Sequence, residues 1–196
     1  MTIQVDSGKE KKSESLIQDV LADKKKIQSI KRRLKGACKK RALCTNEIYA
    51  KVRSELGIGH LRYSSFGNSA KFSVHTGLKA KLVRMLDGDG IVLSKLFRTS
   101  TMSIYSLIND KTATTSIAVY EYFDEKSISL PALRKTIADL YDLKVVPGGL
   151  RLVNEDKYST MWDVFVRKLK LTEEQLLKIF GNKQATLVQV LLSYKP

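Results

Sequence analysis

The segment that most restricts the fold of this chain is the run KKKIQSIKRRLKGACKKR at residues 24–41. Ten of its eighteen residues are Lys or Arg, and none is acidic. Such a run cannot enter a hydrophobic core, because an unpaired charge is costly to bury. Only its few apolar side chains can therefore be buried against the rest of the protein or a partner helix.

Those apolar side chains recur at helical spacing. Lys, Arg and Gln fill the positions between them, which predicts a basic helix from about Ser15 with one narrow apolar stripe, ending at Gly36. A stripe this narrow can dock the helix on its own protein or on a partner helix, but it cannot form a domain alone. The stripe consists of Leu16, Val20, Ile27, Ile30 and Leu34.

The composition divides the chain into three parts. Residues 1–14 are polar and lack apolar periodicity, which predicts a flexible tail. Residues 15–42 are predicted to form a basic helical arm. Residues 43–196 are predicted to form an α+β globular body, since 43% apolar content in 196 residues is sufficient for a core. A division of this body into 43–110 and 111–196 is the alternative.

Local signals predict the elements in the first half of the body. Thr45 is typical of a helix N-cap and Gly57 of a helix end, so we predict a helix over residues 45–56. Alternating aromatic and polar residues predict a β-hairpin over 61–76, and a basic amphipathic helix over 77–86 follows. The runs IVLSKLF and TMSIYSLI fit helix or strand, whereas the β-branched residues of TTSIAVYEYF predict a strand.

Capping and turn residues are clearer in the second half. Ser129 is typical of the N-cap of a helix over 129–142, and Pro147 with Gly148 predicts a type II turn within a hairpin over 144–153. Beyond these come a predicted helix over 159–170, a helix with a Thr172 and Gln175 capping box that ends at Gly181, and the apolar segment 185–194.

The element order predicts a mostly helical α+β fold with two β-hairpins. In each half of the body, a helix, a hairpin and a second helix follow one another. This order resembles the winged-helix arrangement, in which one helix enters the major groove and the hairpin lies along the DNA backbone. A generic α+β domain with two hairpins has the same order, so both interpretations stay open.

The charge of the chain indicates a polyanionic partner. The formal net charge is +15 and the isoelectric point is about 9.8. Residues 1–57 hold 15 basic and 7 acidic residues (+8), residues 58–110 hold 7 and 3 (+4), and residues 111–196 hold 13 and 10 (+3). Nucleic acid is the first candidate, because phosphates neutralised by Lys or Arg release their counterions. An anionic membrane surface is the competing partner.

We therefore expect a non-enzymatic protein that binds RNA or DNA through phosphates, with modest sequence preference. The predicted contacts lie in the arm and in a second basic helix. Tyr63 and Phe66 are candidates to stack on bases, although aromatic residues of a hairpin more often face the core. The predicted contacts are Lys24, Lys25, Lys26, Lys31, Arg32, Arg33, Lys35, Lys39, Lys40, Arg41, Arg62, Lys71, Lys79, Lys81 and Arg84.

Motifs for catalysis or for metal binding are missing from the sequence. The LDGDG segment fails as an EF-hand loop, because Ile91, Val92 and Arg98 stand where an oxygen ligand, Gly and Glu are required. Cys38 and Cys44 lack zinc-finger spacing, as do His60 and His75, and phosphate-binding and nucleophile motifs do not occur. We therefore expect no metal and no cofactor.

Two alternatives to the binding protein stay open. A metal-dependent nuclease could use dispersed acidic residues. A structural assembly protein of the viral matrix or nucleocapsid type would use the basic surface for genome or membrane, and apolar segments such as residues 187–194 for homo-oligomers. The acidic candidates for the nuclease are Asp87, Asp89, Glu121, Asp124 and Glu125.

The sequence contains no signal-peptide pattern and no apolar run of membrane-spanning length. We therefore expect an intracellular location, which includes the cytoplasm, the nucleus and the interior of a virion. Near the C-terminus, Trp162, Phe165, Val166 and Leu169 recur at helical spacing and are predicted to face the core.

Overall fold

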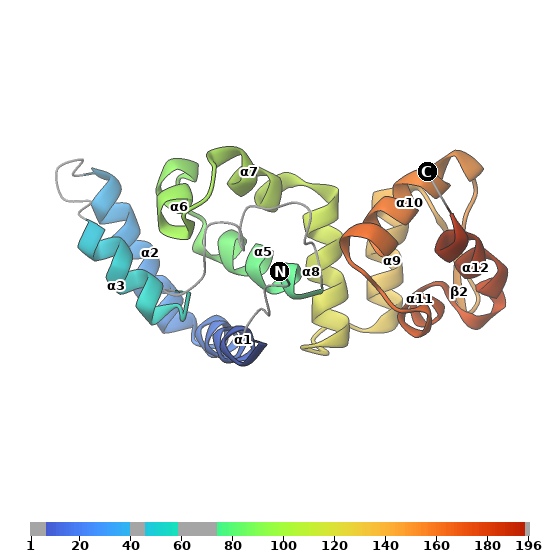
Figure 1. The fold of residues 1–196 in the computed structure, drawn as a ribbon, viewed down its shortest axis with the longest axis horizontal. Coiled ribbons are helices and arrows are strands. Elements are labelled where there is room, and N and C mark those ends of the chain that lie inside the picture. The colour runs from blue at the N-terminus through green and yellow to red at the C-terminus, as the bar shows by residue number, and fades with distance from the viewer. Residues whose placement is uncertain (1–6, 40–45, 59–73, 195–196) are drawn as a thin grey trace, which may run out of the picture. The chain divides into compact units, whose positions relative to one another are not determined.

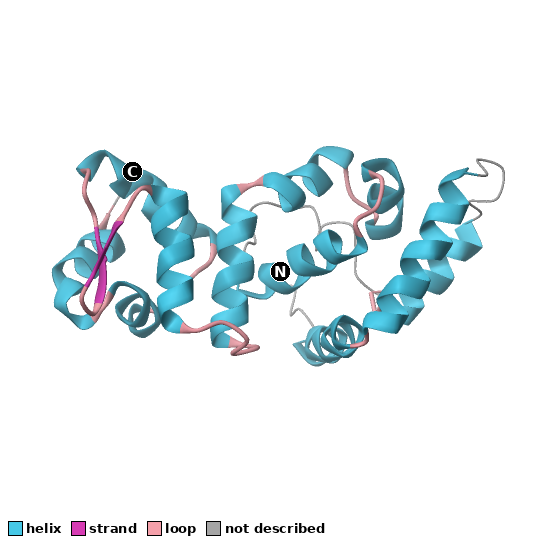
Figure 2. Cartoon of the chain, turned by 180° about the vertical axis from the view of Figure 1, so that it is seen from behind, coloured by secondary structure: helices cyan, strands magenta, loops and turns pink. Residues whose placement is uncertain are grey.

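The computed structural model describes residues 7–39, 46–58 and 74–194. These residues are mostly helical and include one two-stranded antiparallel sheet, in agreement with the predicted α+β class (Figures 1 and 2). In the part of the chain that is described, no helix combines the length and the apolar character needed to cross a bilayer.

The chain forms two compact units. Unit 1 comprises Met1–Asn68 and Leu78–Asn109, and unit 2 comprises Ser69–Gly77 and Asp110–Pro196. The helices that supply unit 1 are α1 (Ser7–Ala22), α2 (Lys24–Lys39), α3 (Asn46–Glu55), α5 (Val74–Leu86, whose first residues count with unit 2), α6 (Gly90–Phe97) and α7 (Thr101–Asn109).

The core of unit 1 is built from one face of each of these helices. Val20 of α1 and Ile27, Ile30 and Leu34 of α2 are buried, so the predicted apolar stripe docks the basic helix on its own chain. Helices α2 and α3 run side by side (Figure 1), and α6 packs against α3 and α7. Leu16, the first residue of the predicted stripe, is instead partly exposed.

The predicted single basic helix is broken at Asp23. The Asp23 carboxylate accepts a hydrogen bond from the Lys26 backbone N–H at 3.0 Å, and the Asp23 carbonyl accepts one from that of Ile27 at 3.1 Å. Asp23 therefore acts as the N-cap of α2. The prediction that Gly36 ends the helix was wrong, because Gly36 lies within α2. Helix α1 begins at Ser7, within the segment 1–14 that was expected to be a tail.

The next elements confirm the local signals where the structure describes them. Helix α3 is followed by Gly57, whose φ of +67° is the left-handed conformation expected after a helix. The predicted hairpin over 61–76 lies outside the described residues up to residue 73, and residues 74–76 belong to α5 rather than to a strand. Helix α5 ends at Leu86, as predicted.

The two ambiguous runs, IVLSKLF and TMSIYSLI, both form helices. Helix α6 begins after Asp89, whose carboxylate accepts hydrogen bonds from the N–H groups of Ile91 at 2.8 Å and Val92 at 3.3 Å. The LDGDG segment is therefore a turn between two helices. Asp89 is the cap of the second helix, and this carboxylate is already bound to backbone.

Unit 2 contains the small sheet and the remaining helices. At its centre, the Phe165 ring contacts the tilted ring of Tyr141 and the edge-on ring of Phe180, with centroid separations of 5.6 and 5.4 Å. Its elements are α8 (Lys111–Phe123), α9 (Leu130–Tyr141), β1 (Lys144–Val146), β2 (Gly149–Arg151), η2 (Glu155–Lys157), α10 (Tyr158–Met161), η3 (Trp162–Lys168), α11 (Glu173–Phe180), η4 (Asn182–Gln184) and α12 (Ala185–Ser193).

The strand predicted for TTSIAVYEYF was wrong, because these residues form α8. Asp110 caps this helix, accepting a hydrogen bond from the Thr112 N–H at 3.0 Å. Thr115 donates its hydroxyl to the Lys111 carbonyl at 2.8 Å and lies 2.7 Å from the Tyr141 hydroxyl. Helical hydrogen bonding therefore satisfies the β-branched polar side chain, and packing on α9 overrides the weak strand preference.

The second half confirms most of its predictions. Ser129 caps α9, and the capping box formed by Thr172 and Gln175 precedes α11. Strands β1 and β2 form the predicted hairpin, with Gly148 at a φ of +88°. The predicted helix over 159–170 is α10 continued by η3, whose wider π-helical turns shift the register. Phe165 and Leu169 are buried, whereas Trp162 and Val166 lie at the edge of the core.

Candidate nucleic-acid interface

The orientation of α2 follows from its buried side. Ile27, Ile30 and Leu34 all point into unit 1. Because a helix turns by about 100° per residue, Lys25 and Arg32 lie opposite these three residues, and Lys24 and Lys35 lie on the adjoining side. All four are exposed. We call these four residues the exposed basic face of α2.

Arg33 lies at the border of the buried side and has a structural partner. Its guanidinium donates two hydrogen bonds to the Glu55 carboxylate of α3, at 2.8 and 2.5 Å. The hydrogen bond raises the pKa of Arg33 and holds the pKa of Glu55 below its usual range. The Arg33 Nε is buried without a partner. Arg33 therefore joins α2 to α3, so its guanidinium is already bound within the protein.

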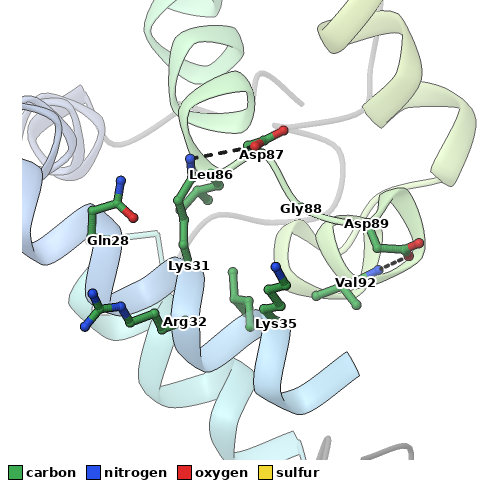
Figure 3. Close-up of a pocket in the computed structure, with 10 residues that line it drawn as sticks. Gln28, Lys31, Arg32, Lys35, Leu86, Asp87, Gly88, Asp89 and Val92 are labelled. Carbon is green, nitrogen blue, oxygen red and sulfur yellow. Dashed lines mark hydrogen bonds and ion pairs between the residues drawn. The ribbon is translucent and has the colours of Figure 1, made fainter. Parts of the chain in front are cut away.

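A groove runs between α2 and the turn from α5 to α6. Its volume is about 460 Å³. Figure 3 shows Lys31 reaching toward Asp87 while the Arg32 guanidinium points away from it. The groove is lined by Gln28, Lys31, Arg32, Leu34 and Lys35 of α2 and by Leu86, Asp87, Gly88, Asp89 and Val92 of the opposite wall.

The two walls of this groove differ in charge. The α2 wall has three cations, and the opposite wall has two carboxylates. Asp89 is bound to the backbone of α6, and Asp87, whose side chain is 85% exposed, lies 3.9 Å from the Lys31 ammonium. An ion pair this exposed contributes little to stability. An anion therefore meets attraction along α2 and repulsion at the turn, which favours contact at the exposed basic face over entry into the groove.

The predicted second basic helix, α5, exposes fewer cations than the sequence suggested. Lys79 and Lys81 of α5 are half-buried, and both have electrostatic or hydrogen-bonding partners in the protein. Arg84 donates its Nε hydrogen to the Leu107 carbonyl near the end of α7, at 2.9 Å. The role of Arg84 as a phosphate contact therefore stays a prediction, although its Nε is already used by backbone.

Arginine side chains at helix ends are a feature that the sequence analysis missed. The Arg53 guanidinium lies 3.4 Å from the Lys95 carbonyl and 3.5 Å from the Leu96 carbonyl, at the end of α6. Burial, together with the charge of Arg98, lowers the pKa of Arg53. Arg134 donates to the carbonyls of Ile179 at 2.7 Å and Lys178 at 2.9 Å, at the end of α11. A cation is favoured at the negative end of a helix.

Several predicted contacts cannot be placed on this surface. Lys39 is the last residue of α2, and its side chain is not described. Lys26 and Lys31 are half-buried at the borders of the exposed basic face. The candidates that lie outside the described residues are Lys40, Arg41, Arg62 and Lys71, together with Tyr63 and Phe66.

The acidic candidates form no metal centre in the part of the chain that the structure covers. Among residues 7–39, 46–58 and 74–194, no group of three His, Cys, Asp or Glu side chains is arranged to hold a metal ion. Asp87 and Asp89 have the roles described above, and Glu125 lies 3.4 Å from the Ser127 hydroxyl. Comparison with protein-family models, with curated proteins and with solved structures finds no significant match to this chain.

Proposed function

We propose that this protein is a non-enzymatic nucleic-acid-binding protein that contacts phosphates through the exposed basic face of α2. The observation that carries the proposal is the separation of roles on this helix. The apolar side docks on unit 1 and Arg33 is bound to Glu55, whereas Lys24, Lys25, Arg32 and Lys35 face solvent. A cationic surface held on a rigid helix neutralises several phosphates at once.

The basic residues at the start of α2 destabilise the helix, and this supports the proposal. Lys24, Lys25 and Lys26 stand in the first turn of α2, which contains no acidic residue. The N-terminus of a helix carries a partial positive charge, so cations there are unfavourable. A charge arrangement that weakens the helix is more readily explained by a ligand than by stability.

Salt dependence of binding tests the proposal. The α2 variant replaces Lys24, Lys25, Arg32 and Lys35 with Gln, and labelled duplex DNA and RNA serve as probes. Wild-type affinity is expected to fall steeply with salt. In the α2 variant, the slope of log K against log[salt] on duplex DNA should decrease by about 0.9 for each phosphate that the variant no longer neutralises. Arg33 is left in place because its replacement would disturb the packing of α2 on α3.

A matched control removes the same number of charges elsewhere. Lys111, Lys126, Lys135 and Lys170 are all exposed and lie in unit 2. Their replacement with Gln should leave the slope close to that of wild type. Equal slopes in the two variants would mean that net charge alone governs binding, which would refute the α2 site. Cleavage of the probe in the presence of Mg²⁺ would refute the non-enzymatic role and favour the nuclease alternative.

We also propose a specific mode of DNA binding, in which unit 2 acts as a winged helix. In unit 2, helix α9, the β1–β2 hairpin and the helical segment of α10 and η3 follow in the order that this arrangement requires. If unit 2 binds DNA in this way, DNA footprints of the intact protein should be specific to a sequence. Protection of every sequence alike would favour the generic α+β interpretation.

A structural assembly protein is the second candidate, and one apolar surface favours it. Ile91, Met102 and Tyr105 in unit 1 are 58%, 81% and 53% exposed. Tyr105 lies against Gly90, because a Cβ added there would be 2.9 Å from the Tyr105 ring. Large exposed apolar side chains that adjoin one another often mark a binding surface. Concentration-dependent assembly in sedimentation, abolished by Met102→Gln, would support this candidate, and vesicle flotation would test for anionic lipid.

A further inference from the structure

The β1–β2 hairpin of unit 2 holds cations that face one another across the strands. Lys144 and Arg151 are register partners in the antiparallel pair, and both are exposed. Partners directly opposite in a sheet point to the same face, and like charges in such positions destabilise the pair. The hairpin therefore carries an electrostatic cost that an anion on this face would relieve.

A groove with cationic side chains opens on the same face of the hairpin. Its volume is about 230 Å³, which is enough for a phosphate group. Among the described residues that line it, two are cations and none is acidic. The lining residues are Val146, Pro147, Gly148, Gly149 and Arg151 of the hairpin, and Phe180, Lys183 and Gln184 from the end of α11 and η4.

Close backbone contacts fix the walls of this groove. A Cβ on Gly149 would lie 2.0 Å from the Phe180 carbonyl oxygen, and a Cβ on Gly181 would lie 2.2 Å from the Gly148 carbonyl oxygen. Only glycine allows the hairpin to approach the end of α11 so closely. Arg151 and Lys183 therefore project from two segments that are held together, so little ordering is required when a ligand binds.

The two cations of this groove lack partners within the described residues, unlike the other arginines of unit 2. Arg134 is bound to the carbonyls at the end of α11, and Arg167 is bound to Asp163. Neither Arg151 nor Lys183 has an ion pair or a side-chain hydrogen bond to the described residues. An exposed cation without an internal partner can form charge-assisted hydrogen bonds to a phosphate.

We propose that the groove of the β1–β2 hairpin binds a phosphate group of a nucleic-acid backbone, with Arg151 and Lys183 as its ligands and with Lys144 opposite Arg151 in the strand pair. This inference rests on the proposed function for the nature of the partner, but it adds a second contact surface in a different unit. The hairpin then contributes one or two phosphate contacts in addition to those of α2.

The test uses the full-length protein and three variants. The hairpin variant carries Arg151→Gln with Lys183→Gln, and its control carries Lys126→Gln with Lys135→Gln, which removes two exposed charges from the same unit. The third variant is the α2 variant described above. Binding to a labelled 20-base-pair duplex is measured as a function of salt. The slope of log K against log[salt] should decrease by about 0.9 to 1.8 in the hairpin variant and remain unchanged in its control.

A second measurement observes the groove directly. Isotope-labelled wild-type protein is titrated with inorganic phosphate, and the amide signals of Gly148 and Gly149 are followed by NMR. These signals should shift in a saturable way in wild type but not in the hairpin variant. Absence of a saturable shift, together with a normal salt slope in the hairpin variant, would overturn the inference.

The α2 variant and the hairpin variant test the two sites separately. If the α2 variant loses affinity for the duplex and the hairpin variant does not, the hairpin inference is overturned and the proposed function stands. If only the hairpin variant loses affinity, the α2 site is overturned and the hairpin site stands. If wild type binds phosphatidylserine vesicles through the hairpin but no nucleic acid, the ligand is a lipid headgroup, and both proposals are overturned.

Discussion

Helices α2 and α11 carry their charges in opposite orders. In α11, Thr172 and Gln175 form a capping box, Glu173 and Glu174 lie between them in the first turn, and Lys178 lies in the last turn. Each of these choices favours the helix. In α2, three lysines occupy the first turn, and only Asp23, just before it, offsets their charge.

The charges of the two helices act on helix stability in opposite directions. The charges of α11 stabilise the helix itself, so its sequence is explained by folding alone. The charges of α2 work against the helix, which is held in place by its buried apolar side and by the pair of Arg33 with Glu55. The remaining cations require another explanation, and a polyanionic ligand supplies one.

The largest expected effect tests whether tertiary packing holds both helices. Ile30 of α2 and Ile179 of α11 are both fully buried. Ile30→Ala and Ile179→Ala should each lower the free energy of unfolding by about 2–5 kcal/mol, measured in urea. Ile91→Ala, at an exposed position, is the control and should change it by less than about 1 kcal/mol. A small effect at Ile30 alone would mean that α2 is not anchored by its apolar stripe.

A smaller effect on stability is expected from the ion pair between Arg33 of α2 and Glu55 of α3. The hydrogen bond from Arg33 lowers the folded-state pKa of Glu55, so its contribution to stability is present above the unfolded pKa near 4.3 and is lost as pH falls through the folded value. Because both side chains are about one-third exposed, Glu55→Gln should cost only about 0.5–1 kcal/mol at neutral pH.

This difference between wild type and Glu55→Gln should shrink as pH falls below about 4. Urea unfolding at several pH values measures it, and Glu155→Gln at an exposed position is the control. Nucleic-acid affinity at neutral pH should be unchanged by Glu55→Gln. A pH-independent difference would contradict the role of the ion pair.

The smallest expected effect comes from reversing one charge in the first turn of α2 or of α11. Lys25→Glu places an acidic residue in the first turn of α2 and should raise the free energy of unfolding by about 0.3–1 kcal/mol. Glu174→Lys makes the reverse change in α11 and should lower it by a similar amount. Low ionic strength is used because salt screens the effect. Only Lys25→Glu should also weaken nucleic-acid binding. A loss of stability in that variant would contradict the conclusion that the lysines of the first turn destabilise α2.

Much of the helical fold could be predicted from the sequence, because caps and turns depend on neighbouring residues. Ser129, Thr172 and the Pro147–Gly148 turn act through local backbone geometry, and the structure confirms each of them. Two further caps could have been found by the same rule. Asp23 and Asp110 each precede a helical run, and recognising them would have placed the break before α2 and the start of α8.

For the candidate site, the sequence predicted only where basic residues are concentrated. The sequence indicated ten cations over residues 24–41, but not which of them have partners within the protein. Arg33 lies beside Arg32 in the sequence, yet one is bound to Glu55 and the other is exposed. Arg84 likewise resembled a surface cation until the end of α7 was placed beside it.

The sequence by itself determined the basic character of α2, its apolar stripe and the capped helices of unit 2, because these depend on residue type and on spacing along one helix. Contacts between distant parts of the chain make α8 a helix, bind Arg33, Arg53 and Arg84 within the protein, and bring Arg151 and Lys183 to one groove. Residue type and spacing could not reveal these outcomes, because a charge is neutralised by groups that are distant in sequence and close in space.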